Sequence, residues 1–282
     1  MSIPSITVVI PVYNHEEFVE RAIISATQQY NCRVQLVIID DGSTDGSFAK
    51  ICELSDSFPT GSIFFTRENR GAHTTINEGL SLASGEYLTI LNSDDVYFDN
   101  RLAIIIEEMR ERRALFGFSE VEYLNNKDQI VTNDPYVESL RIIAESSEKR
   151  PSLSFSLLQN NLAITTGNFV FHRSLYKKVG PFLHYRYVHD WDYILRCAFY
   201  EEPLLVKGKL YGYRVHGTNT FKSLADIAGY ETGEVMRNCM HRLITRVPEN
   251  RLAPSPHCWP GYFEFAMKEM NYHGYLPSEF RS

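Results

Sequence analysis

The first hundred residues alternate between two kinds of segment, and this alternation restricts the fold more than any other feature. Short apolar, β-branched runs predict strands, and stretches with apolar residues three and four positions apart predict helices. The predicted strands are residues 6–10, 34–39, 63–66 and 87–91, and the helices between them are residues 15–29, 46–54 and 72–83. Strands and helices alternating at this spacing form βαβ units with a largely parallel sheet. We therefore expect an α/β fold with helices flanking a central sheet.

Polar and acidic side chains follow three of these strands at the point where each strand ends. They are Tyr13 and Asn14 after the first strand, Asp40 and Asp41 after the second, and Asp94 and Asp95 after the fourth. The carboxyl ends of parallel strands gather at one edge of a sheet, where open α/β proteins bind ligands. Buried carboxylates are costly unless they are paired or hold a metal, and oxygen ligands suit Mg²⁺ or Mn²⁺. An aromatic face, several carboxylates and a divalent cation together favour a nucleotide diphosphate site.

Each of these features alone has an ordinary structural explanation. Tyr13 is also typical of a core or surface position, and residues 40–43 are typical of a turn with a helix cap. Residues 41–46 imitate the start of an EF-hand loop, but its twelfth position, which needs Glu, is Cys52. The glycine patterns of dinucleotide-binding turns and P-loops do not occur. The joint occurrence at three strand ends favours a functional site.

Composition excludes several classes of protein. The 282 residues carry a formal net charge of −7, which argues against non-specific binding of nucleic acid. Apolar runs stay well short of the roughly 18 residues of a membrane span, and the first residues lack the basic region of a signal peptide. Five scattered cysteines without a CxxC pair indicate neither a zinc site nor a disulfide framework. We expect a cytosolic protein with reduced thiols.

The pattern changes after residue 112. Residues 115–124 and 129–132 flank a predicted hairpin turn at residues 125–128. Residues 151–160 and 190–200 are predicted helices, and residues 168–172 and 210–216 are predicted strands. The character of the sequence changes again from about residue 221. An amphipathic helix is predicted over residues 224–244, where Gly229 and Gly233 are possible interruptions. A segment rich in proline and aromatic residues follows.

The chain resembles inverting family 2 glycosyltransferases with the GT-A fold, of the bacterial surface-glycan type. The resemblance covers residues 5–220 in the family's order and stops before the tail. It is carried by residues 7–14, 39–45, 68–71, 77–79, 83–87, 91–95, 167–168, 188–192 and 213–219. It implies a single Rossmann-like domain at residues 1–220, with a nucleotide-binding half at about 1–112 and an acceptor-binding half at about 113–220. Residues 221–282 would form a helical, aromatic extension.

The resemblance also implies a role for each matching residue. Pro11, Tyr13, Asp40, Asp41 and Asp94 would contact the donor nucleotide, with Tyr13 against the base and Asp94 near the ribose and sugar. Asp95 would hold Mn²⁺ or Mg²⁺, and His216 would reach the diphosphate or the metal. Asp190 would be the catalytic base, and the acceptor or sugar side would include Gly167, Asn168, His189 and Trp191. The donor would be a nucleotide sugar, with UDP-sugars favoured, and the acceptor a glycan or a lipid-linked glycan.

Three positions depart from the family pattern. Asn92 and His189 stand where the family often has Asp and Glu, and Ile76 replaces an Arg in the helix after the third strand. Asn92 leaves Asp95 in place. His189 puts the precise tuning of Asp190 as a base in doubt, and Ile76 removes one possible phosphate contact.

The chemistry of inversion supports Asp190 independently. One base must take the proton of the acceptor hydroxyl, and no enzyme nucleophile is needed. Asp190 is also a good helix N-cap, and both roles are compatible. His216 has the alternative of a strand-end residue bonded to backbone, and Trp191 that of core packing.

Other functions remain open from the sequence. A glycoside hydrolase needs a matched carboxylate pair, for which the chain shows no pairing logic. A nucleotidyltransferase or a non-catalytic nucleotide-sugar binding module would share the site at the sheet edge. The tail is predicted to complete the core, to line the acceptor side, or to bring weak peripheral association with the inner face of the cytoplasmic membrane. Aromatic residues suit the last two roles.

Overall fold

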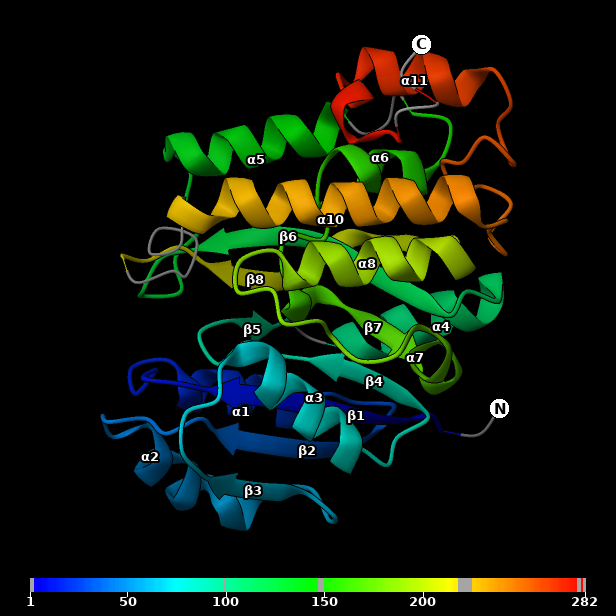
Figure 1. Cartoon of the computed structure of the whole chain (residues 1–282). Coiled ribbons are helices and arrows are strands. Elements are labelled where there is room, and N and C mark those ends of the chain that lie inside the picture. The colour runs from blue at the N-terminus through cyan, green and yellow to red at the C-terminus, as the bar shows by residue number, and fades with distance from the viewer. Residues whose placement is uncertain (1–2, 99, 147–149, 218–224, 278–279, 281–282) are drawn as a thin grey trace.

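One mixed sheet organises the molecule. The computed structural model of the chain describes residues 3–98, 100–146, 150–217, 225–277 and 280. Within them, eight strands pair in the order β3-β2-β1-β4-β7-β6-β8-β5 (Figure 1). Their bounds are β1 (Ser5–Val12), β2 (Arg33–Asp40), β3 (Ile63–Thr66), β4 (Tyr87–Ile90), β5 (Val96–Tyr97), β6 (Phe116–Leu124), β7 (Val170–His172) and β8 (Leu204–Arg214). Six strands share one direction and β5 and β7 oppose it, so the α/β fold with a mostly parallel sheet is confirmed.

Helices cover both faces of this sheet. One face packs on α1 (Val19–Thr27), α2 (Ser47–Leu54) and α4 (Arg101–Arg112). The other packs on α3 (Ala72–Leu82), α6 (Leu153–Gln159), α7 (Arg173–Val179) and α8 (His189–Tyr200). The alternation of strand side chains divides the core accordingly, since Val8 and Ile10 belong to the first cluster and Val9 to the second. This is the arrangement that βαβ units require.

A third apolar cluster lies beyond the sheet. It joins α6 and α8 to the tail helices α10 (Ala225–Thr245) and α11 (Tyr262–Glu269). Figure 1 shows α10 running alongside α8, with α11 near the C-terminus. The remaining elements are α5 (Pro135–Ser146) and the short helices η1 (Ser55–Ser57), η3 (Thr166–Asn168) and η4 (His273–Tyr275). The tail is therefore packed onto the rest of the fold.

The second half of the chain differs from the predictions in several places. The predicted strand at residues 129–132 is reduced to a single bridge between Leu124 and Ile130. Helix α10 runs through Gly229 and Gly233 without interruption. Helices α4, α5 and α7 were not predicted. Thr218, Asn219 and the predicted boundary at residues 220–221 lie outside the described residues.

Within the described ranges, no helix combines the length and the apolar character that a membrane span requires. All five cysteines are free thiols.

Candidate active site

A cleft of about 1380 Å³ opens at the carboxyl edge of the parallel strands. Its walls come from both halves of the chain and from the tail. The predicted site residues that line it are Pro11, Tyr13, Asp41, Asp94, His189, Asp190 and Trp191. Pockets for single small ligands are usually about 300–1,000 Å³, so this cleft has room for two substrates.

The donor side begins at the ends of β1 and β2. Tyr13 is 48% exposed, so its ring is available to a ligand. The Asp41 carboxylate accepts hydrogen bonds from the backbone N–H groups of Arg70 (2.8 Å) and Gly71 (2.9 Å), and it pairs with the Arg67 guanidinium. Asp41 thus fixes the loop that leads into α3, which forms the cleft wall beside Tyr13.

Asp40, which was predicted to contact the donor nucleotide, makes its hydrogen bonds inside the protein. It is 1% exposed and is not among the residues that line the cleft. Its Oδ2 atom accepts hydrogen bonds from the Thr66 hydroxyl at 2.6 Å and from the Ser43 N–H at 3.2 Å. The side chain therefore ties β2 to β3 and to the following turn, and direct contact with a nucleotide would require it to leave these partners.

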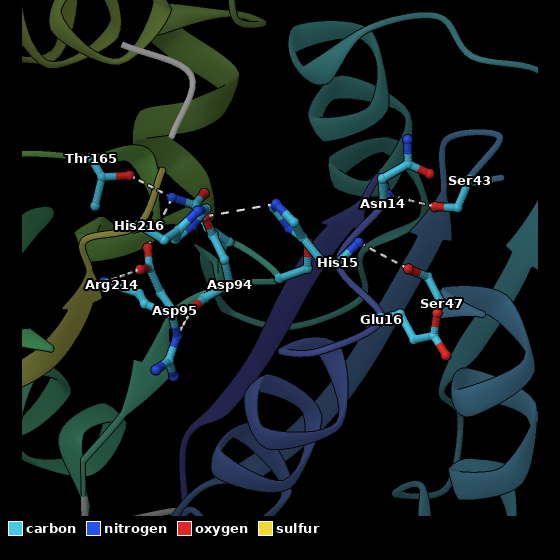
Figure 2. A network of polar contacts seen from close by, with 12 residues as sticks. Asn14, His15, Glu16, Ser43, Ser47, Asp94, Asp95, Thr165, Arg214 and His216 are labelled. Carbon is cyan, nitrogen blue, oxygen red and sulfur yellow. Dashed lines mark hydrogen bonds and ion pairs between the residues drawn. The ribbon is translucent and has the colours of Figure 1, made fainter. Parts of the chain in front are cut away.

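Three side chains converge at the strand-end wall of the cleft, where His15 and Asp94 line it and the buried His216 lies behind Asp94. His15 follows β1, Asp94 follows β4 and His216 follows β8 (Figure 2). Their potential ligand atoms all lie within 4.8 Å of one another. Nε2 of His216 is 3.0 Å from Oδ2 of Asp94, and Nε2 of His15 is 3.8 Å from the same oxygen. Two imidazoles and a carboxylate are a donor set that suits Mn²⁺ better than Mg²⁺, which prefers oxygen.

His15 was missed from the sequence, although it directly follows Tyr13 and Asn14. Its backbone N–H donates to the Ser47 hydroxyl (2.9 Å), and its Nδ1 atom lies 2.7 Å from Ser93 Oγ. Bonding of one ring nitrogen orients the other, as is usual for metal-binding histidines. Figure 2 shows the neighbouring Asn14 bound to Ser43 in the same way, so the whole loop is fixed.

Asp95, the predicted metal ligand, makes its hydrogen bonds inside the protein. The structure turns its side chain inward, with 1% exposure. One oxygen accepts from the Tyr211 hydroxyl at 2.7 Å and from Asn92 Nδ2 at 3.1 Å, and the other accepts from the Arg214 N–H at 2.8 Å. Both oxygens are thus used inside the protein, and Asp94 is the carboxylate that joins His216.

The two adjacent carboxylates have opposite pKa shifts. Burial and the neighbouring charge of Asp94 raise the pKa of Asp95 well above its usual value. Burial also acts to raise the pKa of Asp94, but His15 and His216 outweigh it and hold that pKa below the usual value. Asp94 is therefore the ionised partner that a cation would meet.

Asp190 lies in the first turn of α8 at the opposite wall of the cleft. Oδ2 accepts from Asn161 Nδ2 at 2.8 Å, and Oδ1 accepts from the Trp191 N–H at 2.7 Å. Burial raises the pKa of Asp190 to about 7. A carboxylate with such a pKa in a cleft is well suited to accept a proton near neutral pH.

The other predicted acceptor residues divide into two groups. His189 and Trp191 line the cleft. Burial lowers the pKa of His189 to about 4, so its ring is neutral, and the Trp191 indole N–H donates to the Leu157 carbonyl at 2.7 Å. Gly167 and Asn168 are not among the lining residues.

Gly167 and Asn168 lie beneath the cleft floor. Asn168 is fully buried, accepts from the Ser119 N–H at 3.1 Å and donates to the Ser119 carbonyl at 2.8 Å. A Cβ at Gly167 would stand 1.9 Å from the Tyr211 hydroxyl oxygen, which in turn donates to Asp95. Their position supports the floor, and contact with an acceptor would require rearrangement of this buried layer.

The cleft is also lined by residues of α5 and of the tail that were not predicted individually as site residues. They are Tyr136, Leu140 and Ile143 of α5, Ala228, Gly229 and Thr232 of α10, and Tyr275 of η4. The tail thus contributes directly to the cleft wall.

This architecture is that of the GT-A glycosyltransferases. Staphylococcus aureus TarS 1–349 in complex with UDP-GlcNAc matches with a TM-score of 0.70 at 14% identity, over 98% of this chain and 82% of that chain. The mannosyltransferase PcManGT from Pyrobaculum calidifontis, in complex with GDP-Man and Mn²⁺, matches with a TM-score of 0.63 at 16% identity. That match covers 95% of this chain and 73% of that chain. At these identities the likeness shows the fold.

The family follows from the sequence comparison. The model of glycosyl transferase family 2 matches residues 7–180, and the chain belongs to this family. An uncharacterized glycosyltransferase from Nostoc sp. is 30% identical over 232 residues, which are 78% of this chain and 67% of the relative. One from Haemophilus influenzae is 31% identical over 148 residues, 51% of this chain and 58% of the relative. The match thus spans little more than half of the Haemophilus protein.

Proposed function

We propose that the chain is a metal-dependent, inverting glycosyltransferase that moves a sugar from a nucleoside diphosphate donor to an acceptor hydroxyl. The observation that carries the proposal is one cleft lined by both Asp190 and two members of the cluster, His15 and Asp94, which the buried His216 contacts. UDP-sugars are the favoured donors, since TarS 1–349, which has the same fold, was solved with UDP and with UDP-GlcNAc.

Asp190 is the proposed base. Among the described residues that line the cleft, the carboxylates are Asp41, Asp94 and Asp190. Asp41 is engaged by Arg67 and the loop before α3, and Asp94 by two histidines. Asp190 remains to take the proton of the acceptor hydroxyl while the hydroxyl oxygen attacks the anomeric carbon. A single base without a nucleophile gives inversion.

Asp94, His216 and His15 are the residues that would hold the metal, and their donor atoms suit Mn²⁺ better than Mg²⁺. When bound, it would supply Lewis-acid neutralisation of the leaving diphosphate. Tyr13 would lie against the base, and Asp41 would keep the neighbouring loop in place.

The acceptor is proposed to be a glycan or a lipid-linked glycan that enters from the side of α5 and α10. We also propose a donor half at about residues 1–112, an acceptor half at about 113–220 and an extension from 221. Free thiols at all five cysteines support a reducing compartment such as the cytoplasm.

Thermal-shift screening of a panel of nucleotide sugars, with and without MnCl₂, would identify the donor, because ligands that bind the native state raise its apparent stability. Release of nucleoside diphosphate from the stabilising donor would support the proposal. Pyrophosphate released from a nucleoside triphosphate would favour a nucleotidyltransferase. Donor binding without turnover, under all acceptor conditions, would favour a non-catalytic binding module.

A further inference from the structure

A buried carboxylate of the tail helix α10 contacts the backbone that leads into the proposed base. Glu231 is 8% exposed. Its Oε1 atom accepts from the Arg186 N–H at 2.9 Å, and Oε2 accepts from the N–H groups of Tyr187 at 2.7 Å and Val188 at 3.4 Å. Val188 is the residue before α8, and Asp190 is the second residue of that helix.

The partners of Glu231 are unusual for a buried acid. In the part of the chain that the structure describes, no lysine or arginine forms an ion pair with it. Burial of a carboxylate is costly unless hydrogen bonds compensate, and here three consecutive amides do so. Because these amides belong to one short segment, the carboxylate fixes the path of that segment.

Two further contacts hold α10 against the same region. Asn238 donates to the Tyr185 hydroxyl at 3.2 Å. Val235 and Met236 share the third apolar cluster with Leu195 of α8. Figure 1 shows α10 beside α8 along much of its length. Helix α10 therefore contacts both the segment before α8 and the body of α8.

The fixed segment also forms part of the cleft. Residues 185–190 line it without a break. A movement of residues 186–188 would shift the start of α8, and with it the Asp190 carboxylate. A displacement of about 1 Å at a reacting group can cost roughly 10²-fold in rate.

We propose that Glu231 is a positioning residue of the active site, which holds the Arg186–Val188 backbone so that the Asp190 carboxylate faces the acceptor hydroxyl. The inference rests on the proposed role of Asp190. It assigns the tail a part in the reaction that goes beyond completing the core.

Kinetics and ligand binding provide the first test, with Glu231→Gln and Glu231→Ala as variants. Glu234→Gln is the matched control, because it removes the same charge about one turn along α10 and spares the three amides. We expect kcat to fall about 10-fold to 10²-fold in the Glu231 variants. Binding of UDP in the presence of MnCl₂, measured by calorimetry, should stay within about twofold of the parent, since the hydrogen bonds of Glu231 go to residues 186–188 and not to the donor side.

The environment of Asp190 provides a second test that needs no transferase activity. The chain has two tryptophans, so Trp259→Phe leaves Trp191 as the fluorescent reporter. The backbone N–H of Trp191 donates to the Asp190 carboxylate. We expect its emission to change with a midpoint near pH 7 in this background. In the Glu231→Gln background the midpoint should move to lower pH, because hydration of Asp190 removes the effect of burial.

The groups around Asp190 do not interfere with this titration. Tyr136 of α5, Tyr187 and Tyr213 of β8 interact electrostatically with Asp190, and burial raises the pKa of each above its ordinary value. Burial lowers the pKa of the adjacent His189 to about 4. None of these groups therefore changes charge near pH 7.

The outcomes separate the inference from the proposed function. Folded Glu231 variants that keep both the parent kcat and the parent midpoint would overturn the inference. Equal losses in the Glu234→Gln control would do so too, because they would show a general effect of charge on α10. If no donor supports turnover, the proposed function fails, while the fluorescence midpoints still decide whether Glu231 sets the surroundings of Asp190.

Discussion

Asp190 carries the proposed proton transfer, and its surroundings set the pH at which transfer occurs. Burial raises its pKa to about 7, against the opposing hydrogen bonds from Trp191 and Asn161. Only the ionised carboxylate accepts a proton, so kcat/KM should rise with pH through about 7 and then level off. Initial rates measured from about pH 5 to 9 test this. A profile without an acid limb in that range would contradict the assignment of the base.

Replacement of the base gives a sharper test of the same residue. Asp190→Asn keeps the size of the side chain and its bond to the Trp191 N–H, but it cannot take a proton. We expect kcat to fall by at least about 10², the usual scale for general-base catalysis. Binding of UDP with MnCl₂, followed by calorimetry, should persist. A collapse of this binding with high residual turnover would make Asp190 a binding residue.

The adjacent carboxylates Asp94 and Asp95 should respond differently to the same substitution. Asp94→Asn removes the negative charge that meets His15 and His216, so binding of Mn²⁺ should be lost, as measured by electron paramagnetic resonance of the free ion. Asp95→Asn should retain Mn²⁺ binding and instead lower stability by about 1–3 kcal/mol, since it disturbs buried hydrogen bonds. The reverse pattern would restore Asp95 as the ligand. Full turnover in EDTA would refute metal dependence.

This pair also shows a limit of sequence reasoning. The sequence places Asp94 and Asp95 together after a strand, but it does not tell which one turns inward. Tyr211 and Arg214, more than a hundred residues later, decide that by bonding Asp95. His15 was missed for the same reason, because its relation to His216 depends on how distant strand ends meet.

The contact between η3 and β8 is the element-scale feature that supports the floor of the site. A Cβ at Gly167 would collide with the Tyr211 hydroxyl. Gly167→Ala should therefore destabilise the fold by about 1–3 kcal/mol, as overpacking does. Gly229→Ala is the control, since its Cβ meets open space and alanine favours a helix. Urea unfolding of both variants measures the difference, and equal stability would show that Tyr211 adapts freely.

Elements were predictable where local patterning decides them. The strand at residues 63–66 has the predicted bounds, and the ends of the other three predicted strands of the first half lie within two residues of the predicted ones. Helix α10 persists through two glycines because Val235, Cys239 and Met240 bury their side chains against α6, α8 and α11. Helix α5 lacked a sequence prediction, and the single bridge at Ile130 falls short of the expected strand. Whether such segments form a helix or a strand depends on packing against distant parts of the chain.

The whole molecule brings its site together from three parts of the chain. Strands β4 and β8 run in the same direction, so Asp94 and His216 emerge at the same edge of the sheet. Helices α5 and α10 then close the far wall of the cleft. The resemblance reached the first two parts through their motifs. It did not reach the tail, whose contribution depends on packing alone.

A chain that ends at residue 220 would reveal how much the fold depends on this tail. The cut falls outside the described residues and removes α10 and α11. Their buried side chains, Met240 and Phe263 among them, cover Leu195 and Phe199 of α8. Each large apolar side chain contributes about 1.5–3 kcal/mol when buried, against a typical net stability of about 5–15 kcal/mol. We therefore expect an insoluble or unfolded fragment, as judged by solubility and circular dichroism.

Other results of the same truncation would separate the possible roles of the tail. A folded fragment that hydrolyses donor but no longer transfers sugar would show that the tail serves mainly the acceptor side. A folded fragment with unchanged transfer would exclude both the packing role and the acceptor role, and it would also contradict the positioning role of Glu231. Because α10 carries both the Glu231 carboxylate and a large part of the third apolar cluster, we expect the fragment to unfold, so that the two roles of α10 are lost together.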